Sequence, residues 1–103
     1  MRFGVIPVEG GRFYRESLHQ VERAEALGFH SVWIEEHHGV KSHYWPSPLT
    51  VLSGYATRAH RLVLGTNIAV LPLYNPVRIA EDAALLDIIS GGRFILGVAI
   101  GYR

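Results

Sequence analysis

The sequence predicts an α/β fold with parallel strands, arranged as the first half (β-α-β-α-β-α-β) of a (β/α)8 TIM-type barrel. Short apolar runs alternate along the chain with segments of helical periodicity, which is typical of a parallel sheet. Three of the four runs are apolar almost throughout rather than at every second residue, as in strands that are covered on both faces. A doubly wound sheet is the competing architecture. The sequence stops directly after its last apolar run, and a whole barrel needs roughly 250 residues, so the half-barrel is favoured.

The first strand is expected at Arg2–Val8, where an apolar run ends in the turn residues Glu-Gly-Gly. A helix follows, because apolar residues recur at spacings of four and three, and Gly28 is expected to end it. The second strand is expected at His30–Glu35, followed by a loop over Gly39–Pro48. The apolar face of the helix consists of Tyr14, Leu18, Val21, Ala24 and Leu27.

A second helix is expected from Pro48 to about Ala59, with Ser47 as its N-cap. The third strand is expected at Arg61–Val70.

The third helix has the clearest boundaries in the sequence. Asn75 is expected as its N-cap and Pro76 as its first residue, and Gly91 or Gly92 should end it. The last strand is expected at Arg93–Gly101.

Composition excludes several classes of function. The net charge is only +1 and the Lys and Arg residues are scattered, so no nucleic-acid partner is expected. The absence of cysteine excludes disulfides, thiolate metal sites and thiol nucleophiles. The longest uncharged run, residues 62–77, is too short and too interrupted by Asn and Pro to cross a membrane. A cytoplasmic location fits this composition.

The most unusual segment is "WIEEHH", which places two acids and two histidines at the end of the second strand. In a parallel α/β sheet, sites form at the carboxyl ends of the strands. Histidine titrates near neutral pH, and Glu35 or Glu36 could hold its tautomer, so an acid/base role is the most natural interpretation. A solvated strand end and a metal site remain as alternatives. Adjacent strand residues point to opposite faces, so His37 and His38 share one ion poorly, although His43 could add a ligand.

Two other strand ends carry weaker signals. Asn67 interrupts an apolar strand, and its amide needs partners that a planar polar ligand could provide. Gly97 and Gly101 do not form a GxGxxG motif, so close glycine packing explains them better than phosphate binding.

Three separated segments, "GFHSVWIEEHH", "GTNIAVLPLYNPVRIAEDAALLD" and "SGGRFILGVAIGYR", together resemble the bacterial-luciferase-like flavin-dependent oxidoreductases. The resemblance covers nearly the whole chain. It implies that residues 1–103 are the N-terminal half of a luciferase-like barrel domain, and hence a fragment. It also implies reduced FMN, or alternatively the deazaflavin F420, at the carboxyl rim, and a separate flavin reductase as partner.

The resemblance further implies roles for particular residues. His37 falls on the catalytic acid/base histidine of the family, and His38 on a helper at the substrate side. Asn67 and Ile68 fall where members have a non-prolyl cis peptide beneath the flavin. The end of the family's fourth strand falls on Ala99, Ile100 and Gly101, of which Ala99 and Ile100 are expected to bind the cofactor. Luciferase itself has an arginine where this chain has Ile100, which argues against light emission. The phosphate-binding residues of the family lie mostly outside the matched segments.

The expected function is that of a flavin-dependent monooxygenase, using reduced FMN and oxygen on a small organic substrate. The alternatives are an F420-dependent oxidoreductase, a truncated half-barrel that only associates or binds flavin weakly, and a metal-dependent hydrolase using His37 and His43. A half-barrel should have unpaired edges at its first and last strands, and barrel-interior side chains such as Ile6, Ile34 or Val98 should be exposed. The chain is therefore expected either to form a homo-oligomer or to require its missing C-terminal half.

Overall fold

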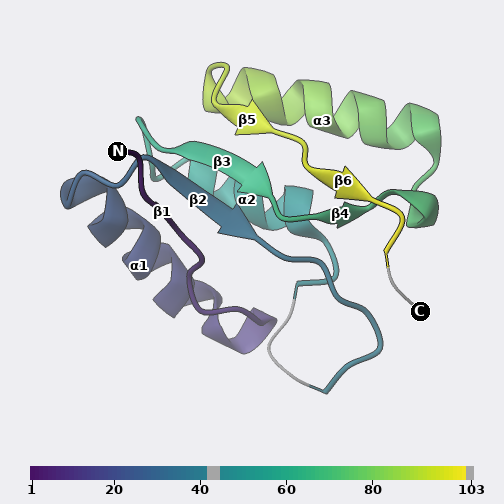
Figure 1. Ribbon diagram of the computed structural model, residues 1–103, viewed down its shortest axis with the longest axis horizontal. Helices are drawn as coiled ribbons and strands as arrows, with labels where there is room; N and C mark the ends of the chain where they lie inside the picture. The colour runs from purple at the N-terminus through teal and green to yellow at the C-terminus, as the bar shows by residue number, and fades with distance from the viewer. Residues whose placement is uncertain (42–44, 102–103) are drawn as a thin grey trace.

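The computed structural model describes residues 1–41 and 45–101, and its strands are all parallel (Figure 1). The main sheet has the order β1-β2-β3-β5, so its strands lie side by side in the order in which they occur along the chain, as in a (β/α)8 barrel. These strands are β1 (Gly4–Val5), β2 (Ser31–Ile34), β3 (Val63–Thr66) and β5 (Phe94–Ile95). A second sheet pairs β4 (Ala69–Val70) with β6 (Val98–Ala99). The predicted alternation of parallel strands and helices is confirmed.

The strands are shorter than the sequence predicted. The expected third strand is divided into β3 and β4, and the expected fourth strand into β5 and β6. The peptide bond between Asn67 and Ile68, which separates β3 from β4, is cis. The ladder resumes beyond it, where the backbone N–H of Ala69 donates to the carbonyl of Gly97 at 2.8 Å. The apolar runs therefore mark the strands correctly but overstate their regular length.

Three α-helices connect the strands: α1 (Tyr14–Ala26), α2 (Pro48–Ala56) and α3 (Pro76–Ser90). Short 3-10 turns precede two of them, η1 (Gly11–Phe13) before α1 and η2 (Leu71–Leu73) before α3. Gly28 has a φ of +83° just beyond α1, as expected of a residue that ends a helix. Helix α2 ends before Ala59, the predicted end. Within the described ranges, no helix has the length and apolar character needed to cross a membrane.

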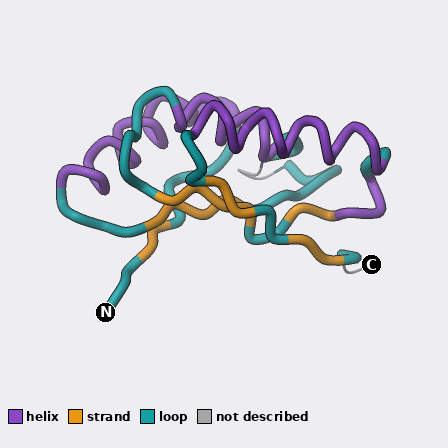
Figure 2. Tube along the Cα trace, turned by 90° about the horizontal axis from the view of Figure 1, so that it is seen from above, coloured by secondary structure: helices purple, strands orange, loops and turns teal. Residues whose placement is uncertain are grey.

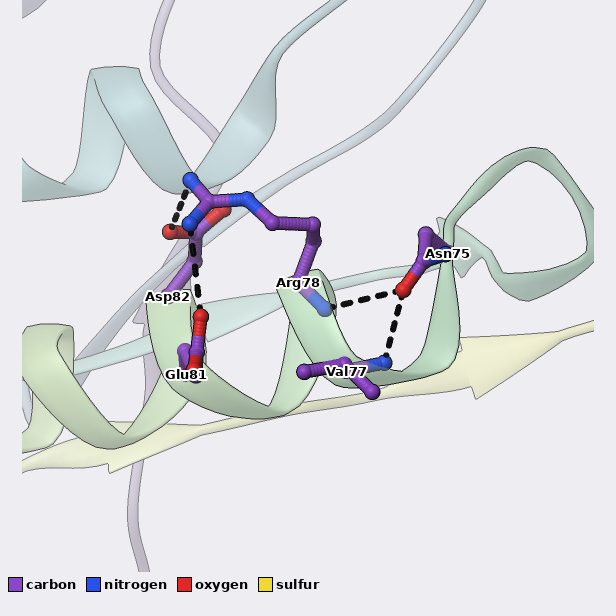
Figure 3. Close-up of polar contacts among 5 residues, drawn as sticks. All are labelled: Asn75, Val77, Arg78, Glu81 and Asp82. Carbon is purple, nitrogen blue, oxygen red and sulfur yellow. Dashed lines mark hydrogen bonds and ion pairs between the residues drawn. The ribbon is translucent and has the colours of Figure 1, made fainter.

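Helix α3 is capped as the sequence predicts (Figure 3). Asn75 Oδ1 accepts hydrogen bonds from the backbone N–H groups of Val77 at 3.0 Å and Arg78 at 3.3 Å. The guanidinium of Arg78 pairs with Glu81 and Asp82 on the next turn. Gly91 takes the left-handed conformation at the other end. Ser47 also occupies an N-cap position, at α2, but contrary to expectation its side chain makes no capping hydrogen bond.

All three helices cover the same face of the strands, and the opposite face has no helical layer (Figure 2). The strand register explains which side chains form the core. Val5, Val32, Leu64 and Phe94 are paired in one row across the main sheet, and all four belong to or pack against the buried cluster beneath the helices. The neighbouring row pairs Trp33, Gly65 and Ile95. Because alternate strand residues point to opposite faces, this second row lies on the uncovered face.

The prediction that barrel-interior side chains are exposed holds for Ile6 and Val98, which are 51% and 44% exposed. It is wrong for Ile34, which is completely buried. Ile34 lies two residues after Val32 and therefore points to the helices with it. Strands β1 and β5 form the edges of the main sheet, and neither has an outer partner within the described part of the chain. This agrees with the expected unpaired edges.

Candidate functional site

The carboxyl ends of β2, β4 and β6 surround a cleft of about 810 Å³. The six residues that the sequence analysis selected as catalytic or cofactor-binding all line it: His37, His38, Asn67, Ile68, Ala99 and Ile100. The other lining residues are Glu35, Glu36, Val40, Val70, Pro72, Leu73 and Gly101. Segments more than sixty residues apart in the sequence are thus brought to one site, because parallel strands place their carboxyl ends at the same edge.

Each of the two histidines is paired with a different glutamate. His37 Nε2 lies 3.2 Å from Glu35 Oε2, and His38 Nε2 lies 2.6 Å from Glu36 Oε1. Both pairs have a spacing of two residues, as expected where successive side chains of an extended segment point to opposite sides. The backbone N–H of His37 also donates to the carbonyl of Trp45 at 3.3 Å, which ties this segment to the loop before α2. The two histidines therefore have different partners.

Glu36 is the most enclosed polar group of the cleft, with a side chain only 1% exposed. Its Oε2 accepts hydrogen bonds from the backbone N–H of Val70 at 2.9 Å and the hydroxyl of Tyr74 at 2.8 Å. Burial raises the pKa of Tyr74 well above its usual value, and the hydrogen bond to Glu36 raises it further. Tyr74 therefore stays protonated and donates throughout the neutral range. Glu36 joins the end of β2 to the segment between β4 and α3.

The Glu35–His37 pair contacts a third carboxyl group from the end of β1. Glu9 Oε1 accepts a hydrogen bond from the backbone N–H of Glu35 at 3.1 Å. Burial raises the pKa of Glu9 above its usual value, and the hydrogen bond from Glu35 only partly opposes this. The charge of Glu35 raises the pKa further, whereas that of His37 lowers it. The loops after β1 and β2 thus form one network of titratable groups.

The rest of the lining comes from the ends of β3, β4 and β6 and from the segment after β4. The cis peptide expected between Asn67 and Ile68 is present. The backbone N–H of Asn67 donates to the carbonyl of Ile34 at 2.7 Å, which fixes this bend against β2. Ile100 is 85% exposed, and Ala99 before it is also exposed. This part of the lining offers backbone groups and apolar side chains, whereas the segment after β2 offers carboxylates and imidazoles.

The donor set does not resemble a metal centre. Within residues 1–41 and 45–101, no group of three or more His, Asp or Glu side chains is placed to hold a metal ion. His43, the third ligand of the metal-site alternative, lies outside the described residues. The described lining of the cleft also contains no Lys or Arg.

Comparison with known proteins places this site in a family. The family model described as luciferase-like monooxygenase matches residues 1–103. The chain belongs to the luciferase-like monooxygenase family. The oxygenase component of a flavin-dependent trigonelline monooxygenase from Acinetobacter baylyi is 33% identical over 87% of this chain. The crystal structure of the monooxygenase RslO1 from Streptomyces bottropensis superposes on 95% of this chain with 34% identity and a TM-score of 0.87.

A second kind of cofactor also occurs among the structural neighbours of this luciferase-like chain. An F420-dependent secondary alcohol dehydrogenase, solved in complex with an F420–acetone adduct, superposes on 97% of the chain with 25% identity and a TM-score of 0.83. The chain spans 25% of the length of the trigonelline enzyme's oxygenase component and 32% of that of each of the two solved chains. The expected luciferase-like resemblance and barrel fold are thereby confirmed.

Two residues of this candidate site were missed by the sequence analysis. Glu9 follows the first strand, and its position at a strand end could have marked it. Tyr74 gave no comparable signal, because its contact with Glu36 spans 38 residues. Glu36 itself was considered only as one of two partners for a histidine, and its bonds to Val70 and Tyr74 appear only in the folded chain.

Proposed function

We propose that this chain is the N-terminal half of the barrel of a flavin-dependent monooxygenase that uses reduced FMN and oxygen on a small organic substrate. The observation that carries the proposal is the cleft itself. A carboxylate–imidazole pair, Glu35 and His37, lines it together with the Asn67–Ile68 bend. Family membership supports the same reaction class, since the similar protein from Acinetobacter baylyi is named as the oxygenase component of a flavin-dependent monooxygenase.

The residues fit the ring of a flavin better than its phosphate. Ile68, Val70, Ala99 and Ile100 give one side of the cleft an apolar surface suited to a planar ring. The described lining has no cationic side chain for a phosphate, so we place the phosphate site in the remainder of the barrel. When bound, the flavin would supply the electrons for the reaction. The chain's own groups would bind the ring, exclude water and move protons.

His37 is the proposed proton-transfer group. An imidazole titrates near neutral pH and can both take up and release a proton there. Glu35 Oε2 lies 3.2 Å from His37 Nε2 and would keep that nitrogen protonated in the neutral ring. The imidazole of His37 would then exchange a proton with a ligand in the cleft. His38, on the other side of the segment, would act on the substrate side.

An F420-dependent oxidoreductase is the second candidate. The similarity to the F420-dependent secondary alcohol dehydrogenase favours it, and the described walls of the cleft do not discriminate between flavin and deazaflavin rings. Titration of the intact protein with reduced FMN and with reduced F420, followed by fluorescence, would decide. A separate flavin reductase as partner is proposed for the FMN case only, from the naming of the Acinetobacter baylyi protein as an oxygenase component.

The decisive experiment measures turnover against pH for the wild type, His37→Asn and His38→Asn in the intact protein, with reduced-flavin affinity measured in parallel. Asparagine keeps some hydrogen bonding but carries no titratable proton. We expect His37→Asn to lower turnover by about 100-fold or more, the scale of a lost general acid or base, while flavin affinity changes little. His19→Asn is the matched control, because His19 lies on the exposed surface of α1. Full turnover and an unchanged pH profile in His37→Asn would show that His37 does not transfer the proton.

A further inference from the structure

Glu36 has three hydrogen-bond partners from two different parts of the chain. His38 Nε2 lies 2.6 Å from Oε1, while Val70 N–H and the Tyr74 hydroxyl lie 2.9 and 2.8 Å from Oε2. An ionised carboxylate accepts from all three, because it has only acceptor sites. A side chain that is 1% exposed and has three hydrogen-bond partners is held in place by the fold, unlike a solvated strand end.

This arrangement fixes the chemistry of His38. If the carboxylate only accepts, Nε2 has to carry the hydrogen, and the neutral ring is then the Nε2–H tautomer. Nδ1 is left as an acceptor. Since the His38 side chain is 44% exposed and lines the cleft, Nδ1 is the nitrogen left to accept a hydrogen bond or a proton from a ligand there.

We propose that Glu36 is a positioning residue that holds His38 as an Nε2–H imidazole, so that its Nδ1 accepts from a hydroxyl or other proton-bearing group of the substrate. The role of the substrate rests on the proposed function, whereas the tautomer does not. His37 and His38 thereby form two separate carboxylate–imidazole pairs, one from each side of the segment after β2. In the Glu36–His38 pair, Nδ1 of His38 is a hydrogen-bond acceptor that does not depend on His37.

Tyr74 links this pair to the segment between β4 and α3. It directly precedes Asn75, the N-cap of α3, and follows η2, whose Pro72 and Leu73 line the cleft. The hydroxyl of Tyr74 and the N–H of Val70 both require an acceptor at Oε2. The carboxylate of Glu36 therefore connects the imidazole of His38 to the segment that carries Pro72 and Leu73.

The same geometry gives a sharp prediction for Glu36→Gln. Val70 N–H can only donate, so the amide oxygen of the variant has to take the place of Oε2. The amide NH2 then faces His38 Nε2, which has to become an acceptor. We expect the neutral ring of His38 to change from the Nε2–H to the Nδ1–H tautomer, with loss of the free Nδ1 acceptor.

Long-range 1H–15N correlation spectra of the histidine rings in the intact protein, without flavin, test this directly. In the wild type His38 should be the Nε2–H tautomer, and in Glu36→Gln it should become Nδ1–H while His37 keeps its wild-type signals as the internal reference. Tyr74→Phe should keep the Nε2–H tautomer of His38, because the 2.6 Å contact remains. An Nδ1–H tautomer in the wild type would overturn the proposal and needs no variant to be folded. An unchanged His38 tautomer in folded Glu36→Gln would also overturn it.

Turnover and flavin binding of the variants distinguish a failure of this inference from a failure of the proposed function. If both are right, Glu36→Gln and His38→Asn should lower turnover by similar factors, and the double variant should be no worse than either alone, since residues of one network are not additive. If the protein binds no flavin, the proposed function fails while the tautomer result stands. Additive losses in the double variant would show that Glu36 does not act through His38.

Discussion

The hydroxyl of Thr66 donates a hydrogen bond of 2.7 Å to the carbonyl of Gly97, across the point where both strands are interrupted. Thr66 is buried at the end of β3, and Gly97 lies between β5 and β6. The backbone carbonyl oxygen of Thr66 occupies the place that a Cβ on residue 97 would need. Glycine is therefore required here by close backbone approach and not by an unusual φ, as the sequence analysis suggested for this position.

Gly97→Ala should destabilise the protein. The atom that meets the new methyl group belongs to the backbone, so the two chain segments would have to move apart, at a cost of about 1–3 kcal/mol. Gly11→Ala is the matched control, because nothing lies within 4 Å of the corresponding position there. Thermal and urea unfolding of both variants would measure the difference. Equal stability of the two variants would contradict the close approach.

Asn75→Ala should lower stability by about 1 kcal/mol, the usual cost of losing an N-cap side chain. Asn75 Oδ1 accepts from two backbone N–H groups in the first turn of α3. Ser47→Ala removes the N-cap residue of α2, whose side chain makes no capping bond, so its effect should be clearly smaller. Denaturant unfolding of the two variants side by side provides the measurement. A larger loss in Ser47→Ala would mean that the two caps are wrongly assigned.

Glu9→Gln should flatten the pH dependence of stability. Because the pKa of Glu9 is raised in the folded protein, the folded state binds more protons than the unfolded state. The stability contributed by this group is fully present below the unfolded pKa of about 4.3, and it is lost as the pH rises through the raised value. Glutamine can still accept the bond from Glu35 but does not titrate. Unfolding free energies measured at several pH values should fall less steeply with rising pH in the variant, and an identical slope would contradict this.

Residues 1–103 expressed alone should be aggregated, dimeric or molten. The edges at β1 and β5 have no outer strand in the described residues, and Ile6 and Ile95 are about half exposed. Unpaired edges and exposed apolar side chains favour association. Size-exclusion chromatography with a thermal melt tests this, and Ile6→Lys, which adds a charge beside the β1 edge, should shift the chain toward monomer. A monodisperse wild-type monomer with a sharp cooperative melt would argue against the half-barrel.

The sequence by itself determined the order of the elements, the two ends of α3 and the position of the candidate cleft. Asn75 and Gly91 act on groups within a few residues, so their effect can be read locally. The cluster at the end of the second strand was likewise sufficient to locate the cleft, since parallel strands bring their carboxyl ends to one edge.

Only the tertiary structure decided which face of the sheet each strand residue occupies and which hydrogen bonds connect the residues of the candidate site. Val32, Trp33 and Ile34 are three consecutive apolar residues, so their polarity did not show that Ile34 faces the helices rather than the barrel interior. The division of two strands depends on contacts between Thr66, Ala69 and Gly97 that span up to 31 residues. Glu36 meets Val70 and Tyr74 across 34 and 38 residues. Such bonds depend on the relative placement of whole elements, which packing of the sheet against its helices fixes and local sequence does not.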